Sequence, residues 1–383
     1  MPEKGRLVQT SLASENNQRS HEGILGAYWI NQSDQVKFED IKLSIQEIKK
    51  NLLSEKQIAA LSHNDEFKYF DTMETDLMHV GHMISVYSDS QIPNLDARLQ
   101  KIQSLGSDYE NNILSGDETF DRWKAWRQIN DLSLSLGTEV RLNLIDNLKK
   151  VRDFGNPLRI PLTDESSPEA KPLLQDASKY FPSQWNKSMS FPLELVRSKD
   201  SNFSSYSGDE KKEMFIGNHR DRIHTASSLS DLASKTSNED ESFLTKASFV
   251  HELSHYYEEN SQTVIGVSNR FLARRGKIIE NKEDLEGPGY VYEDHFASRY
   301  TGRYYLDGAK GSGELFSTGM EATFVGSNGS LIGLSLPLTK DEGEALVHFN
   351  PDPEHRNLTI GFLATIDLAN EKESIFRFLP TFK

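Results

Sequence analysis

The sequence predicts an α+β fold in which a helical N-terminal region precedes a mixed region of helices and strands. Three observations lead to this class. Apolar residues recur at three- and four-residue steps between about Phe38 and Gly155. Proline, serine and aspartate then concentrate in IPLTDESSPEAKPLL, and short apolar runs of strand length follow. Residues 249–257 next read F-V-H-E-L-S-H-Y-Y, which contains the metal-binding motif H-E-x-x-H.

These changes in composition divide the 383 residues into four parts, a length that agrees with two domains. We expect a flexible polar leader at residues 1–35, a helical domain at 36–155, a linker at 156–187 and a second domain at 188–383. If the Pro- and Ser-rich segment is a domain boundary, residues 156–383 should fold and bind metal without the N-terminal helices.

The helical region contains several runs with helical periodicity, beginning with FEDIKLSIQEIKKNLL. LDARLQKIQSLG is expected to end at Gly106 as a C-cap glycine. A third run has Asp117 as its N-cap and stops at Gly155. His79 and His82 lie three residues apart, but without a carboxylate nearby they are expected to be ordinary helix residues.

The second region is expected to begin with strands in SFPLELVRS and EMFIGNHRDRIHTAS. One helix then carries H-E-x-x-H, another spans SQTVIGVSNRFLARRG, and DPEHRNLTIGFLATIDL forms the last, where Pro353 and Glu354 suit a helix N-terminus. Because two histidines already lie in the motif, His219 and His224 are expected to be solvated or packed rather than metal ligands.

Composition and charge exclude several classes of partner and site. The formal net charge of −15 argues against nucleic acid as a partner, because phosphate binding needs clustered Lys and Arg. The chain has no cysteine, so disulfides, thiolate zinc sites and cysteine nucleophiles are excluded. No apolar run suits a transmembrane helix or a signal peptide. We therefore expect cytoplasmic synthesis, no membrane insertion, and any delivery or secretion by a non-classical route.

The H-E-x-x-H motif fits a zinc site when it is placed on a helix at about 100° per residue. His251 and His255 then lie about 40° apart, so both imidazoles can bind one Zn²⁺ ion. Glu252 is offset enough to miss the ion and to act as the general base on a water molecule that the ion activates. The opposite arc is apolar and can face the core; it contains Phe249, Val250, Leu253, Tyr256 and Tyr257.

A catalytic zinc ion usually has a third protein ligand, which the motif does not supply. The glycine and third histidine that metzincins place shortly downstream are missing from YYEENSQTVI. A carboxylate must come from further along, either Glu293 or Asp294 in YEDHFASRY, or Glu314 or Glu321 in GSGELFSTGMEATF. A solvated surface position is the alternative for each of them.

The stretch E-L-F-S, which begins at Glu314, resembles the stretch that supplies the glutamate ligand in gluzincins, including lethal-factor-type toxin proteases. Together with Y-x-G-R-x-Y at residues 300–305 and D-P-E…I-G-F-L, it is similar to zinc-peptidase domains of phage head-associated and bacterial toxin-like proteins. This resemblance implies a zincin-like metallopeptidase domain, with Glu314 as the third ligand 59 residues after His255. Asp294 and Glu293 remain rivals, because D-H-F-A resembles the same stretch.

The resemblance also implies a tyrosine that donates a hydrogen bond to the developing oxyanion. Tyr305 and Tyr300 are the candidates, and core packing is their alternative role. Arg303 could bind a carboxylate or a substrate carbonyl, or form a surface salt bridge. Glu321 is expected to lie behind the metal ligands or on the surface. Zincins place an edge strand before the metal helix, here GNHRDRIHTAS, which can pair with an extended peptide.

The resulting hypothesis is a zinc-dependent endopeptidase that acts on a protein or peptide and is delivered as a toxin or effector or carried with a phage. The helical region would direct delivery, assembly or substrate choice through a partner in the particle or delivery system. The alternative is a structural component of a phage-like or injection particle with a vestigial or stabilising zinc site. An intact Glu252 favours the enzyme, because a purely structural site does not need a general base. A zinc hydrolase with a non-peptide substrate is a third hypothesis.

Overall fold

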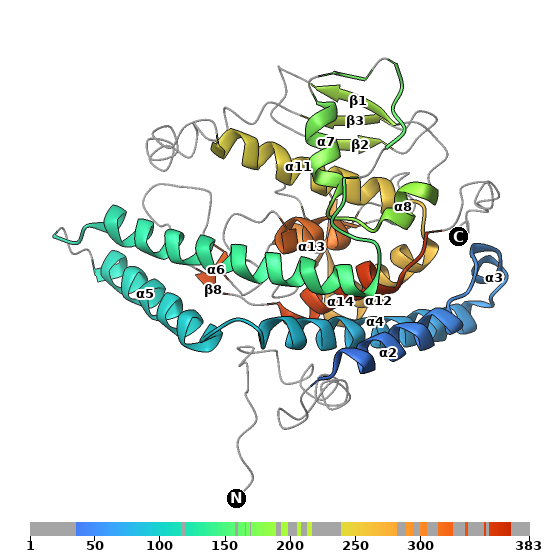
Figure 1. Cartoon of the computed structure of the whole chain (residues 1–383), viewed down its shortest axis with the longest axis horizontal. Helices are drawn as coiled ribbons and strands as arrows, with labels where there is room; N and C mark the ends of the chain where they lie inside the picture. The colour runs from blue at the N-terminus through green and yellow to red at the C-terminus, as the bar shows by residue number, and fades with distance from the viewer. Residues whose placement is uncertain are drawn as a thin grey trace, which may run out of the picture.

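The computed structural model is described over the following residues: 36–115, 119–157, 160–164, 166–168, 170–188, 193–197, 205–207, 213–216, 239–281, 289–293, 299–304, 313–324, 334–335, 348–349 and 352–368. Helices dominate this part of the chain, and a few short strands accompany them (Figure 1). This content agrees with the predicted α+β class at a coarse level. None of the described helices combines the length and the apolar character needed to cross a membrane.

The N-terminal region is helical, as expected. Its elements are α2 (Phe38–Asn51), α3 (Glu55–Ala59), α4 (His63–Asp89), α5 (Leu95–Ser115) and α6 (Arg122–Val151). The expected end of a helix at Gly106 is wrong, because α5 continues for nine residues beyond it. A single helical glycine costs only about 1 kcal/mol, and the buried Ile102 and Tyr109 hold α5 against α6 on both sides of it.

The ends of α6 differ in detail from the prediction. Asp117, the expected N-cap, lies outside the described residues, and the side chain of Asp121 accepts the capping hydrogen bond from the backbone N–H of Lys124. The helix ends at Val151, and Gly155 then has a φ of +85°. This backbone conformation favours glycine, so Gly155 marks the turn after the helix rather than its last residue.

The expected linker at 156–187 contains two helices, α7 (Lys171–Ser178) and α8 (Ser183–Ser188). Trp185 of α8 is fully buried, and its indole N–H donates to the carbonyl of Ile366 at 2.7 Å. This segment is therefore part of the packed structure. Its proline and serine residues indicate breaks between short elements, which composition alone cannot distinguish from an exposed linker.

The second region contains three small sheets and four helices among the described residues. Strands β1 (Glu194–Arg197) and β3 (Glu213–Ile216) pair in parallel, and β2 (Ser205–Ser207) pairs antiparallel to β3. The remaining strands form the sheet β4 (Lys277–Asn281), β5 (Gly289–Glu293) and β6 (Arg303–Tyr304), and the pair β7 (Leu334–Ser335) and β8 (His348–Phe349). The helices are α11 (Glu239–Glu258), α12 (Gln262–Arg275), α13 (Leu315–Phe324) and α14 (Pro353–Thr365), and η1 (Arg299–Gly302) is a short 3-10 turn.

Most of the elements expected in this region are present. Helices α12 and α14 occur where they were predicted, with Ser261 and Asp352 as their N-caps. Strands β1 and β3 lie within the two predicted strand segments. The rest of the second segment, with His219 and His224, lies outside the described residues, and so does the expected peptide-pairing strand.

One hydrophobic core unites the helical region with the second region. It includes Leu77 of α4, Leu148 of α6, Trp185 of α8, Leu253 of α11 and Phe362 of α14. Helices α4 and α14 pack more extensively against each other than any other pair of described elements, and they lie side by side in Figure 1. The expected domain boundary therefore does not separate two hydrophobic cores. An amphipathic pattern shows that α4 buries a face but does not show which helix covers that face.

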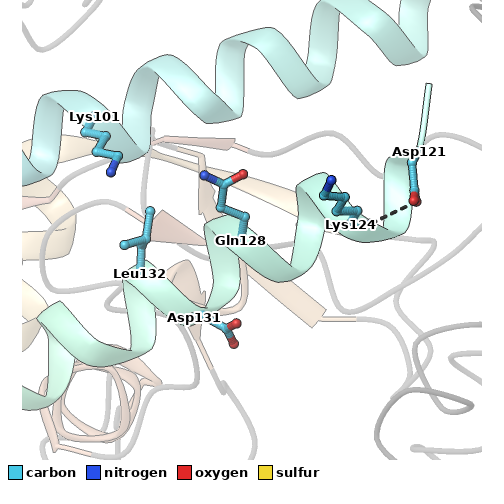
Figure 2. Close-up of a pocket in the computed structure, with 6 residues that line it drawn as sticks. All are labelled: Lys101, Asp121, Lys124, Gln128, Asp131 and Leu132. Atoms are coloured by element: carbon cyan, nitrogen blue, oxygen red, sulfur yellow. Dashed lines mark hydrogen bonds between the residues drawn. The ribbon is translucent and has the colours of Figure 1, made fainter.

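Helices α5 and α6 extend away from this core as a long hairpin with a smaller core of its own (Figure 1). The residues buried in it are Ile92, Leu95, Ile102, Tyr109, Ile129, Leu136 and Val140. Figure 2 shows a hollow beside this hairpin, lined by Lys101, Asp121, Lys124, Gln128, Asp131 and Leu132. The lining mixes positive and negative side chains, and none of its residues belongs to the metal motif.

Candidate metal centre

Helix α11 carries His251, Glu252 and His255 through the interior of the protein. Its predicted apolar arc is fully buried, and the residues of that arc are Phe249, Val250, Leu253, Tyr256 and Tyr257. The opposite side is also largely covered, since His251 and Glu252 are 9% and 5% exposed. Helix α13 packs against α11, with α7 and strands β2 and β3 also in contact with it. The motif thus lies on an internal helix and not on an amphipathic surface helix.

Glu314 meets both histidines of the motif. Its Oε2 atom is 3.0 Å from Nε2 of His251 and 3.1 Å from Nε2 of His255. One ligand atom from each of the three residues lies within 4.8 Å of the others, and this is the only such His, Cys, Asp and Glu group found among the described residues. Two ligands of a tetrahedral zinc ion, each about 2.0–2.1 Å from it, are about 3.3 Å apart. The three side chains therefore fit a single ion.

The backbone on both sides of Glu314 is held in place. Its N–H donates to the carbonyl of Arg303 in β6 at 3.1 Å, and its carbonyl accepts from the backbone N–H of Thr318 at 3.0 Å. The hydroxyl of Ser317 donates to Oε2 of the carboxylate at 2.7 Å. Glu314 thus stands at the junction between β6 and the first turn of α13, and the sheet and the helix together direct its side chain toward α11.

A carboxylate also faces the second nitrogen of each histidine. Nδ1 of His251 is 3.2 Å from Oε2 of Glu321, whose side chain is 41% exposed. Nδ1 of His255 is 3.6 Å from Oε2 of Glu258, whose side chain is 1% exposed. At hydrogen-bond distance, the Glu321 carboxylate favours a proton on Nδ1 of His251 and leaves Nε2 available to a metal. The structure thus places Glu321 behind the motif, as one of its two predicted positions. Glu258 was missed, although its spacing of three residues from His255 was visible in H-Y-Y-E.

The electrostatics of this cluster are those of a cation site. Burial disfavours a charged imidazole, but the Glu314 carboxylate outweighs this effect and raises the pKa of His255 to about 10. It also raises the pKa of His251 well above its ordinary value. Burial alone would raise the pKa of Glu314, yet the two imidazoles hold it well below its usual range. A divalent cation can bind such a set by displacing the imidazole protons.

The pKa of Glu252 is shifted in the opposite direction to that of Glu314. Burial raises the pKa of Glu252, and the two neighbouring histidines only partly oppose that shift. A buried carboxyl group with a raised pKa is a better proton acceptor and donor near neutral pH than a solvated one. Glu252 follows His251 on α11 and is therefore rotated by about 100° from it, as a group that acts beside the metal ligands requires.

The other predicted site residues are only partly described. Asp294 and Tyr305 lie outside the described residues. Glu293 ends β5 and Tyr300 belongs to η1, which contacts α13, but their side chains also fall outside the described part of the chain. Arg303 is buried, which argues against a salt bridge on the surface, one of its two predicted roles, and its backbone carbonyl accepts from the N–H of Glu314.

Comparisons with known proteins add nothing to the geometry of the site. No family model matches the chain, and no curated protein or solved structure matches it either. The fold and the site together define a protein with a buried group of two histidines and one glutamate that could hold a metal ion. The resemblance to gluzincins stays a prediction.

Proposed function

We propose that this protein is a zinc-dependent peptidase in which His251, His255 and Glu314 bind the metal. The observation that supports this proposal is the contact of Glu314 with both histidines, of which the nearer in sequence, His255, lies 59 residues earlier in the chain. Two histidines and one glutamate are the protein ligands of several catalytic zinc sites, where the fourth position is left to water or substrate. Structural zinc sites usually have four protein ligands.

Glu252 favours catalysis over a stabilising role for the ion. A structural site needs only its ligands, whereas hydrolysis needs a base beside them. Glu252 is buried next to a ligand, and burial raises its pKa. This is the behaviour expected of a group that must take up and release a proton during one reaction cycle.

Each residue of the centre has its own role in the proposed reaction. When bound, zinc would supply polarisation of the substrate carbonyl and a lowered pKa of the attacking water. Glu252 takes a proton from this water as it attacks the carbonyl carbon, and then gives the proton to the leaving amine. Glu321 lies within hydrogen-bond distance of the His251 imidazole and keeps it oriented, and Glu258 places a negative charge beside His255. Tyr300 and Tyr305 remain the candidates for donating a hydrogen bond to the developing oxyanion.

The predicted partner is a protein or peptide substrate, and a role as a delivered toxin or effector or a phage-associated protease rests on the resemblance alone. The alternative, a structural component of a particle with a vestigial or stabilising zinc site, uses the same ligands but gives Glu252 no task. Substitution of Glu252 therefore separates the two functions.

The test compares Glu252→Gln with wild type and with Glu259→Gln, which alters a glutamate just beyond the end of the same helix. We expect about one zinc per chain in all three proteins. Cleavage of a proteome-derived peptide library should fall by several orders of magnitude in Glu252→Gln alone, because the base is lost and the ligands remain. Equal cleavage by Glu252→Gln and wild type would overturn the assigned base, and zinc without any cleavage would favour the structural alternative.

A further inference from the structure

We propose that His355 on α14 is a positioning residue for Glu314, so that the packed pair of helices α4 and α14 forms part of the metal centre. The inference rests on the proposed function in one respect only, the assignment of Glu314 as a metal ligand. It gives the N-terminal helical region a role in the centre itself, beside the role in delivery, assembly or substrate choice expected from the sequence.

A buried hydrogen bond from His355 links α14 to the ligand segment, beside the ring contact of Phe316 with Phe362. Nε2 of His355 lies 2.6 Å from the carbonyl oxygen of Leu315, the residue that follows Glu314. A carbonyl can only accept, so Nε2 carries the proton and donates it. Burial lowers the pKa of His355, which keeps the ring neutral and suits this role. The bond thus ties the first turn of α13 to α14.

Gly319 allows the ring to come this close. A Cβ atom at this position would lie 2.7 Å from Nε2 of His355 and would also collide with Oγ1 of Thr359. Glycine inside a helix usually costs about 1 kcal/mol relative to alanine, and α13 has only ten residues. The close approach of α14 accounts for a glycine at the middle of this short helix.

The backbone of His355 is in turn fixed by two other helices. Its N–H donates to Oδ1 of Asp352 at 3.0 Å, and the same oxygen accepts from Arg275 of α12 at 2.7 Å. The next residue, Arg356, forms two hydrogen bonds to the carboxylate of Asp89 in α4, at 2.8 and 2.9 Å. His355 therefore projects from a segment that cannot easily shift.

Two glycines allow the backbones of α14 and α4 to approach each other closely. A Cβ atom at Gly81 of α4 would collide with the backbone of Asn357, and one at Gly361 of α14 would collide with the backbone of Leu77. The hydroxyl of Ser85 also donates to Oδ1 of Asn357 at 2.9 Å. A continuous path of contacts thus runs from α4 through α14 and His355 to Leu315.

This path matters because Glu314 must reach two histidines at once. Its Oε2 atom contacts both Nε2 atoms, at 3.0 and 3.1 Å, so a small rotation or shift of α13 would lengthen at least one of these distances. Supporting partners of metal ligands typically contribute 10- to 100-fold to metal affinity. We expect an effect of this size from the hydrogen bond of His355.

The experiment uses the full-length protein and two replacements of similar length. His355→Gln keeps an N–H donor at about the position of Nε2, and His355→Met removes it. Thr365→Val is the matched control, because Thr365 is buried on α14 but bonds only within that helix, to the carbonyl of Gly361. Zinc affinity is measured by competition with a chelator, and thermal unfolding of the metal-free proteins reports stability.

We expect His355→Met to lower zinc affinity by about 10- to 100-fold, and His355→Gln and Thr365→Val to stay close to wild type. Equal zinc affinities of folded His355→Met and His355→Gln would overturn the proposal. Gly319→Ala tests it independently, because the added Cβ should displace the ring and lower zinc affinity with His355 still present. A folded Gly319→Ala protein with wild-type affinity would contradict it.

These outcomes are distinct from a failure of the proposed function. If wild type binds zinc but cleaves no peptide, the peptidase proposal fails, and the comparison of the His355 variants still tests the positioning role. If wild type binds no zinc, the metal centre is absent, and the positioning role is overturned with it.

Discussion

The main core and the distal α5–α6 hairpin differ in the burial of their charged residues. In the main core, Glu252, Glu258 and Glu314 are buried beside two histidines, and their pKa values depart from the ordinary range. Along the hairpin, a hollow is lined by the exposed residues Lys101, Asp121, Lys124 and Asp131 (Figure 2). We therefore assign the proposed chemistry to the buried carboxylates beside the two histidines, and the hollow alone indicates no site.

The most severe test of this comparison is removal of residues 1–155. Because α2, α4 and α6 share the main core with α11 and α14, the fragment 156–383 should be insoluble or unfolded and should bind no zinc. Expression of the fragment, followed by circular dichroism and metal analysis, checks this. A soluble, zinc-binding fragment would show that residues 156–383 are an independent domain, as the Pro- and Ser-rich segment first indicated.

A second test uses the protons held by the buried cluster. Since the pKa of His255 is raised to about 10 and that of His251 is raised well above its usual value, zinc must displace imidazole protons at neutral pH. Zinc affinity should therefore rise with pH between about 6 and 9, by up to about tenfold per pH unit for each proton released. Calorimetry in buffers of different ionisation enthalpy measures the protons. No proton release at pH 7 would contradict these pKa directions.

The stability of the metal-free protein should depend on pH, because the same groups titrate differently in the folded and unfolded states. A raised histidine pKa contributes stability that is fully present below about 6.5, the unfolded value, and is lost as the pH rises through about 10. The lowered pKa of Glu314 contributes stability above about 4.5, which is lost as the pH falls. Denaturant unfolding of the chelated protein should therefore give a midpoint that falls at both ends of this range in wild type, and less so in His255→Ala.

The smallest expected effect on the centre comes from the distal core. Ile129→Ala should destabilise the hairpin by about 2–5 kcal/mol but leave zinc affinity unchanged, because Ile129 packs only in the separate hairpin core. Leu253→Ala removes similar volume from α11 and should lower both stability and zinc affinity. Chelator competition and unfolding of the two variants make the comparison. A loss of zinc affinity in Ile129→Ala would show that the two cores are coupled.

The sequence predicted the parts of the site that depend on local spacing. His251, Glu252 and His255 follow from a helical period, and the start of α14 follows from Pro353 and Glu354. Glu314 was predicted as a ligand only through the resemblance to gluzincins, because helical periodicity cannot relate residues 59 positions apart. From the residues alone, it was one of four carboxylates.

The parts that the sequence did not predict depend on which surfaces meet in space. His355 lies on a different helix from the motif, and only the packed structure shows that Gly319 makes room for its ring. Trp185 lies in a segment whose prolines and serines indicated a linker, yet its ring packs against Tyr257 and Phe316 and its indole N–H donates to the carbonyl of Ile366. The sequence also did not predict that α4 packs against α14, because an amphipathic pattern does not specify which helix covers the apolar face.

The measurement that tests the central assignment most directly is a zinc competition titration of Glu314→Ala, with Glu293→Ala and Asp294→Ala as matched carboxylate controls. Loss of a direct ligand should weaken zinc binding well beyond the 10- to 100-fold typical of a supporting partner, while the two controls keep affinities near wild type. Circular dichroism confirms that all three proteins are folded. A folded Glu314→Ala protein that retains wild-type zinc affinity, with zinc lost from Asp294→Ala or Glu293→Ala instead, would contradict the assignment of Glu314 as the third ligand.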